Sequence, residues 1–118
     1  MASLPSSTIP VAIIDPPRGG IHGSVLKAIR ACKPIEHLIY ISCSPLSLSA
    51  DICSLCAVRG GCSGCGIPFM PIALSCFDIF PDTEHVETVV VFERCNDEDG
   101  NVNPKSKYYR ADAVIDGA

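Results

Sequence analysis

The stretch V-A-I-I-D-P-P-R-G-G (residues 11–20) decides the class of fold. Its first four residues form a continuous apolar run, which is typical of a strand buried on both faces of a parallel sheet. The Pro-Pro and Gly-Gly pairs end this strand, because proline lacks an N–H donor and glycine favours turns. The first expected element is therefore a strand at 11–14 that ends at Asp15.

Helical and strand patterns alternate downstream of this strand. Apolar residues recur with a helical period over 24–32, and the run H-L-I-Y-I-S (37–42) predicts a second buried strand. Ser47 or Ser49 is expected to cap a second helix that extends to about Val58. This order predicts an α/β fold with a parallel sheet. Two more strand-like stretches, 69–80 and 86–92, are close enough in sequence to pair antiparallel.

Composition and charge limit the classes of function. The chain has 118 residues, of which 47% are hydrophobic and 19% charged, as in a globular domain or a part of one. A formal net charge of −4 argues against this chain gripping a phosphate backbone on its own. Residues 1–10 lack the basic and apolar blocks of a secretory signal, and no apolar run is long enough to cross a membrane, so no membrane partner is expected.

The chain contains eight cysteines. Without a secretory signal, these are expected to be reduced thiols, metal ligands or a catalytic thiol rather than disulfides. This places the chain in an intracellular, reducing compartment, without deciding between cytoplasm, nucleus and organelle.

Three segments with reactive residue types follow one another: I-I-D-P-P-R-G-G (13–20), I-Y-I-S-C-S-P (39–45) and F-P-D-T-E-H-V-E (80–87). They resemble the three C-terminal signatures of the S-adenosylmethionine-dependent uracil-5-methyltransferases of transfer and ribosomal RNA. The resemblance covers residues 11–94. Position 44 is Ser where many relatives have Asn, and the cysteine-rich segment 53–65 is unfamiliar in the family.

The resemblance implies a fold and a domain division. The fold would be the C-terminal part of a Rossmann-like class I methyltransferase sheet, with two parallel β-α units followed by an antiparallel strand pair. Residues 1–10 would be an N-terminal extension, 11–94 a partial methyltransferase catalytic domain, and 95–118 a polar C-terminal tail.

The resemblance also implies a reaction: methyl transfer from S-adenosylmethionine to carbon 5 of uridine in RNA, with transfer RNA as the expected substrate. Carbon 5 of uracil is a poor nucleophile until a thiolate adds to carbon 6, and a base must then remove the carbon-5 proton. By this match Cys43 is the nucleophile, Glu87 is the base and Asp15 contacts S-adenosylmethionine. Arg18 is expected to support substrate binding electrostatically, with a structural salt bridge as the alternative.

Taken without the family, the same residues have plainer interpretations. Cys43 could be a small buried hydrophobic residue, Glu87 a solvated carboxylate at a strand end, and Asp15 an acidic turn residue. A competing hypothesis is a zinc-stabilised module, because two CxxC pairs can supply four thiolates; these are Cys53, Cys56, Cys62 and Cys65. A third is a truncated, non-catalytic interaction domain.

Several parts of a complete enzyme are not found in this sequence. No glycine-rich loop follows a first strand, where such enzymes hold the cofactor. Relatives carry about three more strands on the amino side and an RNA-binding β-barrel further upstream. We therefore expect a piece of a longer or split enzyme, whose N-terminal cofactor-binding and RNA-binding portions are supplied by the full-length protein. Alone, the chain is expected to be inactive, and marginally folded or self-associating through an exposed strand edge.

Overall fold

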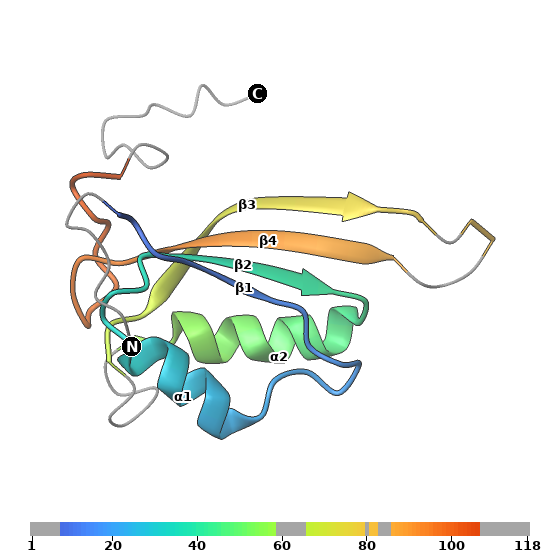
Figure 1. Cartoon of the computed structure of the whole chain (residues 1–118), viewed down its shortest axis with the longest axis horizontal. Coiled ribbons are helices and arrows are strands. Elements are labelled where there is room, and N and C mark those ends of the chain that lie inside the picture. The colour runs from blue at the N-terminus through green and yellow to red at the C-terminus, as the bar shows by residue number, and fades with distance from the viewer. Residues whose placement is uncertain (1–7, 59–65, 80, 83–85, 107–118) are drawn as a thin grey trace.

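The computed structural model describes residues 8–58, 66–79, 81–82 and 86–106. Helices and strands follow one another as the sequence predicts, with two β-α units before a final pair of strands (Figure 1). The elements are β1 (Val11–Ile14), α1 (Gly23–Ala31), β2 (His37–Ser42), α2 (Pro45–Cys56), β3 (Phe69–Phe77) and β4 (Glu87–Arg94).

The strands form one mixed sheet in the order β1-β2-β4-β3. β1 and β2 are parallel, and β4 is antiparallel to both β2 and β3, which confirms the expected α/β fold and the antiparallel pair. The insertion of β4 between β2 and β3 is a finding that the sequence pattern does not predict. β3 suits the edge position because Pro71 has no N–H to donate and the strand is irregular between Pro71 and Ala73.

Both helices cover the same face of the sheet (Figure 1). Burial alternates along β2 and β4, so every second side chain enters the core between sheet and helices. The buried apolar residues are Leu38, Tyr40, Phe69, Val90 and Phe92 from the strands with Leu26, Leu48 and Leu55 from the helices. Within the described ranges, no helix has the length and apolar character needed to cross a membrane.

The opposite face of the sheet corrects one expectation. β1 was expected to be buried on both faces, yet Val11 and Ile13 are 50% and 66% exposed. Their neighbours on the same face, Ile39 and Val91, are only half-buried. The apolar run therefore marks a strand built to be covered on both sides, while the described helices cover one. As expected, β1 is an edge strand. Self-association of the chain remains a prediction.

Two boundaries differ from those expected. α2 begins at Pro45 with Ser44 as its N-cap, earlier than Ser47 or Ser49. Proline favours the first helical position because its φ is already helical and the missing N–H has no helical partner there. β3 ends at Phe77, short of the expected residue 80.

The first part of the polar tail contacts the end of β4. The backbone N–H of Asn96 donates to the Asn101 carbonyl at 2.8 Å, which closes a turn after β4. Ser106 donates its hydroxyl to Glu93, whose side chain is buried beneath this segment. The tyrosines at 108 and 109 lie outside the described residues.

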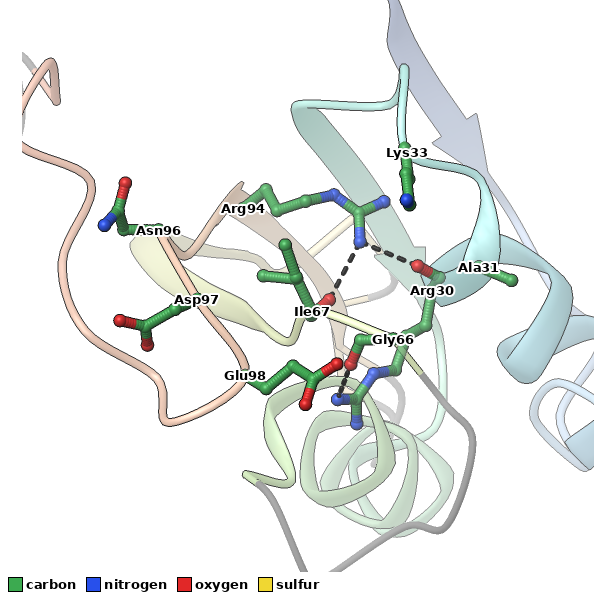
Figure 2. A pocket seen from close by; sticks show the side chains of 9 residues that line it. All are labelled: Arg30, Ala31, Lys33, Gly66, Ile67, Arg94, Asn96, Asp97 and Glu98. Carbon is green, nitrogen blue, oxygen red and sulfur yellow. Dashed lines mark hydrogen bonds between the residues drawn. The ribbon is translucent and has the colours of Figure 1, made fainter.

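Arg94 fastens the end of the sheet that lies at the amino ends of β1 and β2. Its guanidinium donates to five backbone carbonyls at 2.8–3.2 Å and lies 4.1 Å from the Phe69 ring centroid. Figure 2 shows two of these bonds. The carbonyls belong to Ile29, Arg30, Cys32, Ile35 and Ile67. Arg94 therefore adds a charged donor to the carbonyls at the end of α1, of which Ile29 and Cys32 also accept from a backbone N–H, and it ties α1 to β4.

We expect Arg94→Met to lower the free energy of unfolding by about 3 kcal/mol or more, because several buried carbonyls lose a charged donor. The measurement is the midpoint of urea unfolding. Lys33→Met is the control: Lys33 is an exposed cation beside the same arginine, and its loss should change stability by no more than about 0.5 kcal/mol. Equal midpoints for the two variants would contradict this role of Arg94.

Candidate active site

Three of the predicted site residues gather at one end of the sheet, where β1 and β2 have their carboxyl ends. Asp15 follows the last residue of β1, Cys43 follows the last residue of β2, and Glu87 is the first residue of β4. Ser42 pairs with Thr88 in the β2–β4 register, so Cys43 and Glu87 are the next residues on adjacent strands toward this end. Since β4 runs antiparallel to β2, its amino end meets the carboxyl ends of β1 and β2. This end is where open α/β sheets bind ligands.

A tight turn holds Cys43 beyond the end of β2. The Ser42 hydroxyl donates to the Ser44 carbonyl and accepts from the Ser44 N–H, both at 3.0 Å. Ser42 is buried, so Cys43 is the middle residue of a turn anchored in the core. The Cys43 side chain is half-buried rather than enclosed. Ser42 is a supporting residue that the sequence reasoning missed, although it lies within the second signature.

The amino end of α2 begins directly after Cys43. Ser44 is the N-cap, and its carbonyl accepts from the Leu48 N–H at 3.0 Å. The free N–H groups and the dipole of a helix favour negative charge at this end. Cys43 thus directly precedes the N-cap of α2.

Asp15 lies at the rim of a shallow cavity of about 520 Å³ beside the end of β1. The cavity is mostly apolar, with Asp15 and His22 as its polar side chains. Its apolar walls are Ile13, Ile14, Pro16, Pro17, Ile21 and Val25. A carboxylate at an apolar wall suits a ligand that combines a cationic centre with a flat or apolar group.

Arg18 is an exposed residue of the turn that follows Asp15. The Gly20 N–H donates to the Pro17 carbonyl at 2.9 Å, which places Arg18 and Gly19 at the tip of this turn. In the part of the chain that the structure describes, no carboxylate forms an ion pair with Arg18. The described residues therefore give no support to the alternative of a structural salt bridge at Arg18.

The turn after Asp15 is attached to α2 by two side chains that the sequence reasoning also missed. Asp51 accepts from the Ile21 N–H at 3.0 Å, and Ser47 donates its hydroxyl to the Arg18 carbonyl. Asp51 is only 6% exposed. A charged residue among apolar ones in a helical pattern is the sequence signal that could have singled it out.

The cysteines of the zinc hypothesis are only partly described. Cys53 is exposed and Cys56 is half-buried against the core, one turn apart at the end of α2. Cys62 and Cys65 lie outside the described residues, as does His85. Among the described residues, no group of three or more side chains is placed to hold a metal ion. The zinc site stays an untested alternative.

Burial raises the pKa of the Cys56 thiol to about 11. Without zinc, alkylation of Cys56 is therefore expected to be slow at pH 8 and to accelerate as the pH approaches 11, because the thiolate is the reactive form. Peptide mass spectrometry after iodoacetamide treatment measures this rate, and the exposed Cys53 serves as the internal control. Zinc in the purified protein, with alkylation at both cysteines increased by a chelator, would favour the metal hypothesis instead.

A second cavity, of about 380 Å³, lies at the opposite end of the sheet, near Arg94 (Figure 2). Arg30 and Arg94 line it, but their guanidinium groups donate to backbone carbonyls, including Gly66 and Ile67. Acidic Asp97 and Glu98 line the same cavity. These arginines hold the fold together, and the candidate site is the end that carries Cys43.

Comparison with known proteins identifies a family for this chain. A family model described as tRNA (uracil-5-)-methyltransferase matches residues 3–95. The chain is 40% identical over 90 residues to the human tRNA (uracil-5-)-methyltransferase homolog A, covering 76% of this chain and 14% of the relative. It is 37% identical over 99 residues to homolog B of Danio rerio, covering 80% and 20%.

A bacterial protein is similar as well. The 23S rRNA (uracil(1939)-C(5))-methyltransferase RlmD of Idiomarina loihiensis is 38% identical over 87 residues, covering 70% of this chain and 18% of the relative. The chain thus spans between one seventh and one fifth of the length of these relatives. The matched residues include all three segments that supply the candidate site.

Proposed function

Because this chain belongs to the tRNA (uracil-5-)-methyltransferase family, we propose that it carries the nucleophile and the base of an RNA methyltransferase acting on carbon 5 of uridine. The observation that supports this most is the β2–β4 register, which makes Cys43 and Glu87 neighbours at the ligand-binding end of the sheet. A covalent route needs one thiol and one base near the same ring, and the adjacent positions of these two residues support the assignment of both roles to them.

The proposed reaction uses these two residues in turn. The Cys43 thiolate forms a bond to carbon 6 of uracil, which makes carbon 5 nucleophilic. When bound, S-adenosylmethionine supplies the methyl group that carbon 5 takes up. Glu87 then removes the carbon-5 proton, the electron pair re-forms the double bond, and the bond between sulfur and carbon 6 breaks. Cys43 leaves as a thiolate; another turnover requires that Glu87 passes its proton to solvent and that the methylated RNA and the demethylated cofactor dissociate.

The residues around Asp15 fit S-adenosylmethionine in part. Its cationic sulfonium and ammonium groups suit the Asp15 carboxylate, and its adenosine suits the apolar cavity wall. The fold we propose is the C-terminal part of a Rossmann-like class I methyltransferase sheet, whose remaining cofactor-binding elements belong to a longer polypeptide. The small share of the relatives that this chain spans is in keeping with that proposal.

Substrate, domain division and compartment follow as further parts of this proposal. Transfer RNA is the proposed substrate, because several similar proteins are named for it. The catalytic part would be 11–94, between an extension at 1–10 and a tail at 95–118. The chain would act in a reducing, intracellular compartment, in keeping with the free thiols of the described cysteines, which are Cys32, Cys43, Cys53, Cys56, Cys76 and Cys95.

A graft tests the proposal. In this chimera, called the grafted enzyme, residues 11–94 replace the matching segment of the human relative. Incorporation of labelled methyl groups into transfer RNA is measured for the grafted enzyme and, in parallel, for the 118-residue chain alone. We expect the grafted enzyme to form 5-methyluridine and the chain alone to be inactive. A well-folded graft that binds S-adenosylmethionine and RNA but transfers no methyl group would refute the proposal.

A further inference from the structure

The Asp51 carboxylate joins two segments that are far apart in the sequence. It lies on α2 and is only 6% exposed. One oxygen, Oδ2, accepts from the Ile21 N–H at 3.0 Å and from the Tyr40 hydroxyl at 2.5 Å. Ile21 belongs to the loop that follows β1, and Tyr40 belongs to β2. A single carboxylate oxygen therefore connects the loop carrying Asp15 to the strand that ends at Cys43.

Tyr40 is a fixed donor in this arrangement. Its side chain is fully buried in the core. Burial, together with the hydrogen bond to Asp51, raises the pKa of Tyr40 well above its usual range, so the hydroxyl keeps its proton. Tyr40 lies on β2, three residues before Cys43, which directly follows the strand, so the buried ring is a fixed point close in the chain to the thiol.

The loop fits closely against Asp51. Gly20 has φ +81°, and a Cβ there would lie 2.9 Å from Asp51 Oδ2 and 3.2 Å from Ser47 Cβ. Any larger residue would both strain the backbone and push the loop away from α2. The hydroxyl of Ser47 adds a second attachment one turn earlier on α2, through the Arg18 carbonyl.

We propose that Asp51 is a positioning residue, which holds the loop at residues 15–22 in register with the strand end that carries Cys43. The inference rests on the proposed function, because the relative placement of Asp15, Arg18 and Cys43 matters only if they act in one site. Asp51 acts through its hydrogen bonds to Ile21 and Tyr40. Without it, the part-buried Ile21 N–H and the buried Tyr40 hydroxyl lose this acceptor, and of the described α2 side chains Ser47 still holds the loop.

Amide hydrogen exchange in the 118-residue chain tests the attachment. In Asp51→Ala, we expect the Ile21 amide to exchange about tenfold faster or more, with little change at the core amides of Val90 and Phe92. Asp51→Asn keeps an oxygen acceptor, so it should restore most of the protection. Ser54→Ala is the matched control, because among the described residues this exposed hydroxyl on the same helix donates to the Ala50 carbonyl, within α2.

Gly20→Ala disturbs the contact between the loop and Asp51 without changing α2. It therefore tests the attachment of the loop even if Asp51→Ala does not fold. It should also release the Ile21 amide. Unchanged exchange at Ile21 in the variants, or an equal increase at Val90 and Phe92, would overturn the attachment.

The grafted enzyme then separates positioning from stability alone. Asp51→Ala is expected to raise the KM for S-adenosylmethionine about tenfold, with a smaller effect on kcat and recovery in Asp51→Asn. A change in kcat alone, or none, would overturn the positioning role. An inactive graft with the native Asp51 would count against the proposed function, and the exchange measurements would still decide whether Asp51 holds the loop.

Discussion

Cys43→Ala is expected to abolish covalent capture of RNA containing 5-fluorouridine by the grafted enzyme, and to lower methyl transfer by about 10³-fold or more. Fluorine at carbon 5 cannot be removed by the base, so the bond between the Cys43 sulfur and carbon 6 persists and is seen as a protein–RNA band on a denaturing gel. Alanine has no sulfur to form that bond. The loss should therefore be complete for the adduct and very large for the rate.

Cys53→Ala is the matched control for this variant. Cys53 is also a free thiol of the described chain and is more exposed than Cys43, so nonspecific thiol addition would favour it. Its removal should leave the adduct and the rate unchanged. An adduct that survives Cys43→Ala, or one that disappears in Cys53→Ala, would show that another cysteine is the nucleophile.

Much of the fold was predictable from the sequence because turn-forming residues follow its apolar strands. The apolar runs at 11–14 and 37–42 each stop at Pro-containing turns, and both became the expected strands. The position of β4 between β2 and β3 was not predictable in this way. Pro71 and the irregularity between Pro71 and Ala73 suit β3 to the edge, but a strand pattern does not state which of two antiparallel strands pairs with β2, because that is a property of the assembled sheet.

The candidate site likewise contains residues that local patterns predict and residues that depend on long-range contacts. Cys43, Glu87 and Asp15 were predicted from local signatures, and the sheet brings their positions to one end of the strands. The role of Asp51 depends on a contact with Ile21, thirty positions away, which no local pattern contains. The exposure of Val11 and Ile13, at 50% and 66%, was also not predicted, because an apolar run indicates that a strand suits burial but not which element covers it.

Glu87→Gln is expected to stop the same reaction at a later point. Glutamine has nearly the shape of glutamate but cannot accept the carbon-5 proton, so the methylated adduct cannot release Cys43. Turnover should fall by about 10²- to 10⁴-fold, while a protein–RNA adduct accumulates with ordinary uridine in place of 5-fluorouridine. Mass spectrometry of the trapped adduct should find the added methyl group. Asp78→Asn, at an exposed carboxylate just beyond β3, is the control and should turn over normally.

The two variants constrain each other. Cys43→Ala acts before the bond to carbon 6 forms, and Glu87→Gln acts after the methyl group has been taken up, so the double variant must behave like Cys43→Ala and form no adduct. Since Cys43 and Glu87 follow adjacent strands in register, their effects belong to one site and are not expected to add. If Glu87→Gln prevents the adduct from forming at all, Glu87 assists the attack of Cys43, and the base that removes the carbon-5 proton must be sought elsewhere.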